Sequence, residues 1–438
     1  MKKIFASIFF ILSFLVNGFS GGVKEPSKKP ESIPAKIVVL GHRVHQQVIT
    51  AGKGGDIISD WLKKSGVQTV EWQTLGSNNE IRDRLFREAT LPSTEIQVGF
   101  LLNTSLTPSI KDMFEPLDAY MSKDPIEDYT DIFPGLREAS TFEGKTYAIP
   151  FRHATSALHY NEAYFEKRGI KDPPTTIEQF LEYIPKLTFI REDGTQVYGF
   201  VLHGKGEMYA NTVDLARAWD GDFITTDYKC VANKYGMVKA ISTLHELFKQ
   251  GLYPKAFTAI STNDLNTWMQ QGRVAMTFTS AGRNQFYNDP KQSLFPGKIK
   301  TIPIPASKEI SGKYRVAPAK TEFWCMVIPK NARNKALSWD LIRTLSSKEG
   351  TLRAALNGNG PVRASTYEDP SFQQMVPYWK AEKDILMVAR VAMPAFDNAT
   401  KAADLFNEYA QAAIIGQMDV KEAMDKLTAE VEKLLPKN

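Results

Sequence analysis

The segment TFEGKTYAIPFRHATSALHYN, Thr141 to Asn161, decides the fold that this sequence predicts. Glu143-Gly144-Lys145 is typical of a turn, because glycine supplies the backbone freedom that a tight turn needs. Two extended runs follow, Tyr147–Phe151 and Thr155–Tyr160. Pro150 has no backbone N–H and does not fit inside a central strand, so we expect the chain to leave one sheet there and enter another. A strand that passes between two sheets predicts a hinge between two lobes.

Length and composition agree with two domains. The chain has 438 residues, more than a single hydrophobic core usually organises. It is 43% hydrophobic and 24% charged, which is ordinary for a soluble globular protein. The formal net charge is +5, but lysine and arginine alternate with acidic residues and form no basic tract. This pattern disfavours nucleic acid as a partner.

The N-terminus predicts an export signal over residues 1–20. Lys2 and Lys3 precede the apolar run Ile4–Val16, and a small-x-small cleavage site ends at Ser20. The run is short for a bilayer span, although a retained anchor is the alternative. Cleavage would remove two lysines and no acids and so lower the charge to 5 − 2 = +3. Residues 21–35, rich in proline, lysine, glutamate and serine, predict a linker.

The two cysteines, Cys230 and Cys325, lie far apart in the sequence. An exported protein can keep a disulfide, so a bridge remains an alternative. Cys325 lies in a strongly apolar run, and we favour two separate buried thiols.

The region before the hinge alternates between strand and helix patterns. Strands are expected at 37–40, 67–72 and 96–102, helices at 56–65 and 78–86, and a loop at 41–55. A β-α-β-α-β order implies a mostly parallel sheet covered by helices. Ligands of such sheets bind beyond the carboxyl ends of the strands. Those ends are Gly41–His45, Thr74–Asn79 and Asn103–Ser105.

A second set of elements follows the hinge. The patterns predict strands at 198–202, 274–279 and 323–328 and helices at 161–168, 236–250, 263–271, 333–345 and 403–415. Phe323–Ile328 is a candidate second crossing, and Gly358–Arg363 is an irregular break that suggests a third.

Enzyme and metal signatures are scarce. The sequence has no G-x-S-x-G elbow and no phosphate-binding G-x-x-x-x-G-K-[ST] loop. His42 and His45 are three residues apart but lack the glutamate of a zinc-binding helix. We therefore expect neither a cofactor nor a metal. Trp219, Trp324 and Tyr209 lie near predicted loop ends, where aromatic rings can be core residues or can recognise a polar ring beside fixed hydrogen-bonding groups.

Seven motifs in a fixed order carry a family resemblance. They are Phe114–Tyr120 with Phe133–Gly135, Phe142–Phe151, Leu158–Asn161, Pro174–Phe180, Gly272–Met276, Phe323–Pro329 and Asn359–Arg363. From about Lys36 to the C-terminus, the chain resembles extracellular solute-binding proteins of bacterial ABC importers, in the carbohydrate-binding group that includes maltose-binding protein.

The resemblance implies a two-lobed α/β fold with three hinge crossings, each lobe being a mixed, mostly parallel sheet flanked by helices. The implied lobes are 36–150 plus 327–360 and 151–326 plus 361–438. Ligand bound between the lobes favours a closed state that a membrane permease reads. The resemblance thus implies a periplasmic, monomeric, non-enzymatic protein that delivers a small polar solute to ABC permease subunits. A sugar is the leading solute, and a polyol or an anionic sugar derivative is the alternative.

The same resemblance implies a set of ligand-binding residues. Trp324 matches a stacking aromatic ring and Arg363 a hydrogen-bond donor at the last crossing, while Arg152 and His153 follow the Pro-Phe of the hinge. The full expected set is Trp324, Arg363, Arg152, His153, Asn103, Thr104, His42, Tyr209, Asp220, Asp222, Arg283 and Glu322. Relatives often carry an aromatic residue where this chain has Thr279–Arg283. The replacement by small residues and a charge suggests a solute that can pair with an arginine.

Two other classes of protein could show the same sequence features. An exported carbohydrate-processing enzyme would need two carboxylates at a fixed separation, which Asp220, Asp222 or Glu322 could supply. Nothing in the sequence marks an acid and base pair. A protein that docks on a membrane sensor would have the same fold as a transport protein.

Overall fold

The computed structural model describes residues 33–206 and 208–436. The described residues from Pro34 onward form one compact unit. The predicted export signal and most of the predicted linker lie outside the described residues. Within the described part of the chain, no helix has the length and apolar character needed to cross a bilayer.

One mixed sheet of ten strands runs through the unit in the order β2-β1-β3-β11-β6-β9-β8-β7, with β10 on β6, β12 on β11 and a separate β4–β5 hairpin. The strand bounds are β1 Lys36–His42, β2 Thr69–Leu75, β3 Ile96–Leu102, β4 Thr141–Phe142, β5 Lys145–Thr146, β6 Ile149–Asn161, β7 Phe189–Ile190, β8 Gln196–Phe200, β9 Val274–Ser280, β10 Ile299–Ile302, β11 Lys320–Val327 and β12 Arg390–Val391.

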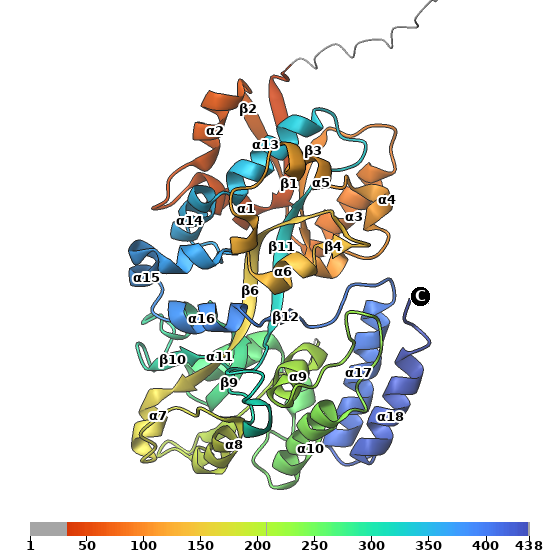
Figure 1. Ribbon diagram of the computed structural model, residues 1–438. Coiled ribbons are helices and arrows are strands. Elements are labelled where there is room, and N and C mark those ends of the chain that lie inside the picture. Colours follow the sequence, from red (N-terminus) through yellow and green to blue (C-terminus); the bar gives the residue numbers. More distant parts are fainter. Residues whose placement is uncertain (1–32, 207, 437–438) are drawn as a thin grey trace, which may run out of the picture. The chain divides into compact units, whose positions relative to one another are not determined.

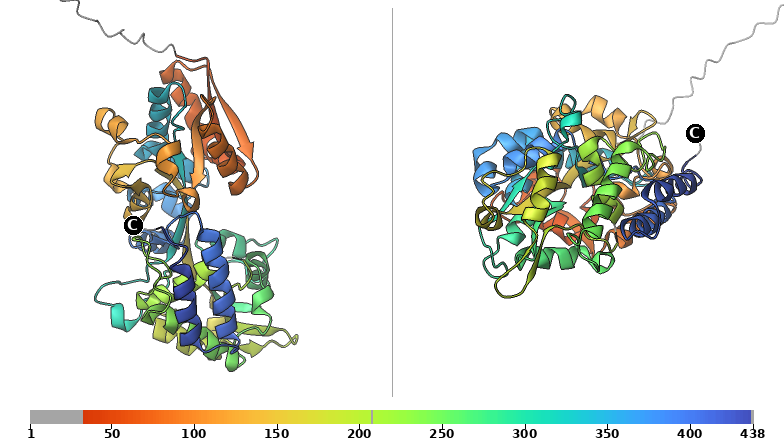
Figure 2. Two further views of the ribbon diagram at one scale, coloured as in Figure 1. Left: turned by 90° about the vertical axis from the view of Figure 1, so that its right-hand side faces the viewer. Right: turned by 90° about the horizontal axis from the view of Figure 1, so that it is seen from below.

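Helices flank both halves of this sheet (Figure 1). Their bounds are α1 Arg43–Thr50, α2 Ile57–Ser65, α3 Asn78–Ala89, α4 Ile110–Met113, α5 Asp118–Lys123, α6 Pro134–Glu138, α7 Glu162–Lys167, α8 Ile177–Lys186, α9 Met208–Ala216, α10 Tyr235–Lys249, α11 Thr262–Gln270, α12 Arg283–Tyr287, α13 Lys335–Ser346, α14 Lys348–Leu356, α15 Pro370–Met375, α16 Trp379–Leu386, α17 Ala399–Ile414 and α18 Val420–Val431. Short 3-10 turns are η1 Asn103–Ser105, η2 Tyr129–Asp131, η3 Arg217–Trp219, η4 Phe257–Ala259, η5 Lys308–Ile310 and η6 Ala364–Glu368. The long helices α17 and α18 lie side by side (Figure 2).

The pairing of the strands confirms the expected α/β class. β1 pairs in parallel with β2 and β3, and β8 pairs in parallel with β9. Between these two parallel groups, β11 and β6 run antiparallel to each other and to their outer neighbours β3 and β9. The two strands therefore join the halves of a two-lobed fold.

The hinge strand differs from its prediction at Pro150. We expected a break there, but β6 is one continuous strand of 13 residues. It pairs with β11 over Ile149–Thr155 and with β9 over Ser156–Tyr160. Pro150 lies opposite Cys325, where the register shifts between Trp324 and Cys325. A bulge accommodates a residue without an N–H, so the proline kinks the ladder without ending the strand.

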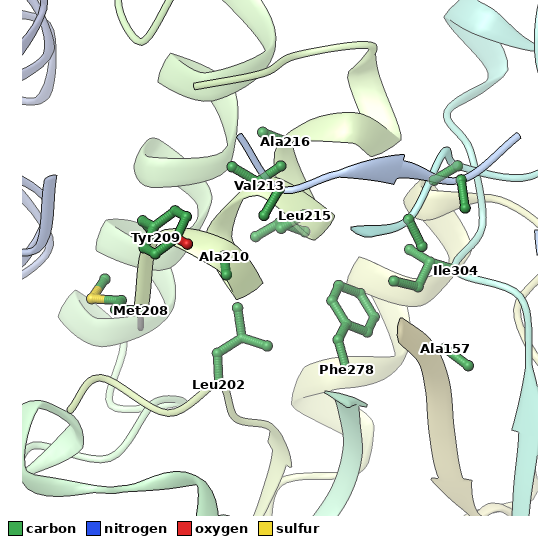
Figure 3. Packing of buried hydrophobic residues seen from close by; sticks show 14 of the residues in the cluster. Ala157, Leu202, Met208, Tyr209, Ala210, Val213, Leu215, Ala216, Phe278 and Ile304 are labelled. Carbon is green, nitrogen blue, oxygen red and sulfur yellow. The ribbon is translucent and has the colours of Figure 1, made fainter. Parts of the chain in front are cut away.

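Alternating side chains of β1 are buried on both faces of its sheet, as expected for a covered parallel strand. Ile37 and Val39 belong to a core with Trp339 of α13, whereas Val38 and Leu40 belong to a core with helix α3. The second core continues into the other half of the sheet, where Figure 3 shows the packing around helix α9.

The structure differs from the sequence prediction at residues 41–55 and agrees with it for the two cysteines. The expected loop 41–55 contains helix α1, which we missed because its N-cap is a histidine. Nδ1 of His42 accepts a hydrogen bond from the Val44 N–H at 3.2 Å. The expectation of separate thiols is confirmed, because Cys230 and Cys325 are both free and buried.

Candidate functional site

A cavity of about 560 Å³ opens beside the first half of β6. Its lining comes from four places: residues 152–154 of β6 with Glu322 of β11, residues 280–285 after β9, the loop 355–361, and residues 372–382 of α15 and α16. A smaller hollow of about 340 Å³ beside β2 and α3 is lined by none of the predicted site residues.

Hydrogen bonds between β6 and the loop 358–361 hold the strand in place at the cavity. The His153 N–H donates to the Gly360 carbonyl oxygen at 3.2 Å, and Nδ2 of Asn359 donates to the Phe151 carbonyl oxygen at 2.8 Å. A Cβ atom on Gly360 would lie 2.4 Å from the His153 oxygen, so only glycine permits this approach. The first crossing and the break at 358–361 are thereby joined at the cavity.

The cavity has one apolar wall and several polar groups. Pro361, Phe372, Met375 and Val376 supply the apolar surface. The polar lining residues include arginines, an asparagine, a tyrosine and glutamates, and Tyr378 and Glu382 come from the same segment as the apolar wall. Polar atoms make up more than half of the accessible lining, so the cavity suits a hydrophilic small molecule.

A chain of buried hydrogen bonds runs from β11 to the cavity. Thr321 and Thr155 share a hydroxyl contact at 2.8 Å, and Thr155 contacts Nδ1 of His153 at 3.0 Å. Nε2 of His153 lies 3.0 Å from the Tyr367 hydroxyl, which donates to Oε2 of Glu382 at 3.0 Å. When the Tyr367 hydroxyl donates to Glu382, its oxygen can accept from Nε2–H of His153, and Nδ1 then accepts from Thr155.

Burial sets the protonation states within this chain. Burial, and then the nearby charge of Arg152, lower the pKa of His153 to about 3, so the imidazole is neutral. Burial raises the pKa of Glu382 to about 7, against the opposing effect of the Tyr367 hydrogen bond. Near neutral pH, Glu382 can therefore act as a hydrogen-bond donor or as an acceptor.

Two polar atoms of the cavity lining are buried without a partner. They are Nη1 of Arg152, a donor, and Oδ1 of Asn359, an acceptor. More than nine in ten buried polar groups in folded proteins find a partner, so such atoms need an explanation. Burial also lowers the pKa of Arg152, although an arginine remains charged. Two residues of the cavity lining thus carry a charged donor and an acceptor that have no protein partner.

Trp324 lies on the same side of the sheet as Arg152, its partner across the β6–β11 pair. The Trp324 ring is half-buried and meets the ring of His45 edge-on, with centroids 4.7 Å apart. Nδ1 of His45 accepts from the His42 N–H at 3.1 Å, and Nε2 is buried without a partner. Burial holds the pKa of His45 well below its ordinary value. These rings lie next to the cavity residue Arg152 but are not part of its lining.

A sequence model of the family described as "Bacterial extracellular solute-binding protein" matches residues 57–378. The chain belongs to this family. It is 24% identical over 293 residues to a putative binding protein of Brucella abortus (strain 2308), covering 62% of this chain and 67% of that one. It is 25% identical over 328 residues to the mannitol-binding protein of Pseudomonas aeruginosa, covering 67% and 70%. It is 24% identical over 266 residues to the erythritol/L-threitol-binding protein of Mycolicibacterium smegmatis, covering 57% and 54%.

Solved structures share the fold. The sugar-binding protein MalE from Xanthomonas citri has a TM-score of 0.76 at 20% identity, covering 91% of this chain and 97% of that one. A solute-binding protein from Agrobacterium radiobacter in complex with ribitol has a TM-score of 0.70 at 19% identity, covering 91% and 98%.

Four of the expected ligand residues of this solute-binding protein line the cavity together: Arg152, His153, Arg283 and Glu322. Arg283 begins α12 and is exposed, with its guanidinium 5.9 Å from the Phe286 ring centre. Glu322 is half-buried and pairs with Ala154 across the sheet. These four residues come from three strands or strand ends that the sheet brings together.

Arg363 lies outside the cavity lining, at a place where protein oxygens accept hydrogen bonds from its guanidinium. Its side chain is fully buried, and Nε donates to the Ser346 carbonyl oxygen at 2.7 Å. Nη2 donates to the Glu127 carbonyl oxygen at 2.6 Å, while Nη1 contacts the Asp128 carbonyl oxygen at 2.9 Å and Oδ2 of Asp131 at 3.1 Å. Arg363 thus braces the third crossing and lies outside the lining of this cavity, and its expected ligand role stays a prediction.

Three further expected residues also lie outside the cavity lining. Asp222 accepts two hydrogen bonds from Nη2 of Arg217 at 3.1 and 3.2 Å. Asp220 pairs with Lys313 at 2.5 Å. Tyr209 is buried among the apolar residues around α9 (Figure 3). Ion pairs or core packing hold these side chains outside this cavity, and their expected ligand roles stay predictions.

The remaining expected residues cap or connect elements. Asn103 is buried, and its Oδ1 accepts from the Phe323 N–H at 2.9 Å. Thr104 is exposed on η1, and His42 caps α1. No group of three metal-ligating side chains occurs within residues 33–206 and 208–436.

Sequence reasoning missed five polar residues of the cavity: Ser280, Gln285, Asn359, Tyr378 and Glu382. Asn359 lies within a motif that we noted only for its arginine. Tyr378 and Glu382 lie in a region that reads simply as helix, and no sequence signal brings them to β6.

Proposed function

We propose that this chain is a periplasmic solute-binding protein that captures a small sugar or polyol in the cavity beside β6 and delivers it to an ABC permease. The carrying observation is the pair of buried, unpartnered polar atoms, Nη1 of Arg152 and Oδ1 of Asn359, in a cavity with an apolar wall. A polyhydroxylated molecule supplies both donors and acceptors, and its C–H face suits the apolar wall.

The names of relatives support this class of solute. Two curated relatives are named for mannitol and for erythritol or L-threitol, and one similar structure holds ribitol. The volume of about 560 Å³ lies within the range of small-molecule pockets.

The position of the cavity supports a closing motion. Its lining combines the first crossing with the break at 358–361, and we propose lobes of 36–150 plus 327–360 and 151–326 plus 361–438. A solute that touches both lobes stabilises the closed state, which the permease would then recognise. We propose further that export removes residues 1–20 and that the mature protein is a monomer.

Thermal unfolding with a panel of solutes tests this function. At a concentration one hundred times Kd, a bound solute should add about 2.7 kcal/mol to the free energy of unfolding. We expect stabilisation by at least one polyol or sugar and none by amino acids or dipeptides as controls. A shift with the controls alone, or with nothing in the panel, would contradict the proposed solute class.

The placement of the carboxylates narrows the enzyme alternative to one pair in the cavity lining, Glu322 and Glu382. Asp220 and Asp222 are held in ion pairs, while Glu322 and Glu382 line the cavity. NMR spectra of a bound solute after long incubation should show it unchanged. Conversion of the solute would establish an enzyme instead.

A further inference from the structure

We infer that the solute carries a carboxylate, as in an aldonic or uronic acid, and that Arg152 and Arg283 hold this group. The inference rests on the proposed function of the cavity and narrows its solute class. It specifies the charge of the solute, which the fold alone does not determine.

Arg152 is the first observation. Its side chain is partly buried, its Nη1 has no acceptor, and no described carboxylate lies within 4.0 Å of its guanidinium. A cation removed from water without a partner is costly, so proteins normally pair it. A carboxylate of the solute would accept two parallel hydrogen bonds from this planar group.

Other buried arginines of this chain show the usual arrangement. Arg217 is fully buried and paired with Asp222 at 3.1 Å, and Arg363 is fully buried and paired with Asp131 at 3.1 Å. Arg152 differs because it faces the cavity and lacks a carboxylate. The missing acid of the pair can therefore come from the solute.

The charge balance of the cavity lining favours an anion. Arg283 adds a second cation that also forms no ion pair with the described carboxylates. Glu322 and Glu382 are the acids of the lining, and burial raises the pKa of Glu382 to about 7. The two arginines thus share the lining with two carboxyl groups, of which Glu382 is partly protonated near neutral pH.

The rest of the lining suits a chain of hydroxyl groups. Oδ1 of Asn359 is a buried acceptor, and Ser280, Gln285 and Tyr378 offer further polar atoms. Met375 lies among the apolar residues that would meet the carbon backbone. Together the groups fit a polyhydroxy acid of sugar size.

Calorimetric titration with matched pairs tests the inference. The pairs are mannitol and mannonate, ribitol and ribonate, and glucose and glucuronate, with glucose 6-phosphate as a second kind of anion. Since a hydrogen bond to a charged group contributes roughly 1.5–3 kcal/mol, we expect at least one acid to bind about 10- to 100-fold more tightly than its neutral partner.

Two variants locate the charge. Arg152→Gln should reduce the affinity for the acid about 10- to 100-fold and weaken that for the neutral partner by a smaller factor, so that the preference for the acid is lost. Arg283→Gln, at an exposed position that does not threaten folding, should act in the same direction with a smaller effect. Arg273→Gln is the matched control, because the Arg273 guanidinium lies 4.0 Å from the Trp268 ring centre and outside the cavity lining.

The outcomes separate this inference from the proposed function. Equal or tighter binding of the neutral partners overturns the carboxylate but keeps the sugar or polyol function. Selective binding of the phosphate ester also overturns the carboxylate. Acid selectivity that survives in both cavity variants removes the arginines from the site. Binding of none of these molecules contradicts the proposed function itself.

Discussion

Arg152 and Arg363 stand at two crossings of one molecule and have opposite surroundings. Arg363 is fully buried, and each of its three guanidinium nitrogens donates to a protein oxygen. Arg152 faces the cavity, and its Nη1 is buried without any acceptor. The comparison teaches that a charged residue at a hinge is structural where the protein supplies its partners. It points to ligand binding where the partners are missing.

The largest expected effect is the loss of stability when Arg363, the arginine with protein partners, is replaced. Arg363→Ala leaves Asp131 and several carbonyl oxygens without their donor, so the free energy of unfolding should fall by about 3–5 kcal/mol. Urea denaturation measures this loss, with Arg152→Ala as the matched control. A stable Arg363→Ala protein that had lost solute binding would reverse the two assignments.

The next effect is the pH dependence of stability at Glu382. Its pKa in the folded protein is raised from 4.5 to about 7, so the folded state binds the proton more tightly than the unfolded chain. The stabilisation is complete below about pH 4.5 and is lost as the pH rises through about 7. Glu382→Gln keeps a neutral side chain and should avoid a loss on the order of 3 kcal/mol.

Denaturation of the wild type and Glu382→Gln across this pH range measures the difference. His153, whose pKa is lowered to about 3, changes stability in the opposite direction in both proteins and so cancels. Parallel pH profiles for the two proteins would show that Glu382 does not gain a proton on folding.

A smaller effect concerns the aromatic neighbour of Arg152. If the bound solute reaches the Trp324 ring, Trp324→Ala should cost about 1 kcal/mol of binding free energy while the fold remains intact. Titration of the solute measures this change, and Trp268→Ala serves as the control outside the cavity. An unchanged Kd would remove Trp324 from the site.

The smallest expected effect is on the stability of a variant of Arg152, the arginine without a protein carboxylate. Arg152→Met removes an unpaired charge and keeps the length of the side chain, so stability should stay equal or rise on the order of 1 kcal/mol. Thermal unfolding without solute measures it. A clear loss of stability would mean that Arg152 has a structural partner in the protein.

Much of the fold follows from local patterns in the sequence. Strands β1 and β3 and helix α10 are confirmed within a few residues, because periodic apolar side chains mark them. The continuous path of β6 through Pro150 was not predictable, since the bulge that admits the proline depends on β11. Helix α1 was missed because histidine is an uncommon cap.

The site was less predictable than the fold. Arg152 and Arg283 were found because they adjoin strands that the motifs mark. The position of Arg363 outside the cavity lining was not predictable, because its partner Asp131 is 232 residues away in the sequence. Glu382 was missed for the same reason, since only the folded chain brings α16 to β6. Which polar groups are paired within the protein is a property of long-range contacts.

A crystal structure with the solute selected by titration tests the central claim most directly. The account predicts the solute in the cavity beside β6, with an oxygen on Nη1 of Arg152 and a hydroxyl on Oδ1 of Asn359. A solute bound elsewhere in the protein, with both of these atoms still unpartnered, would contradict it.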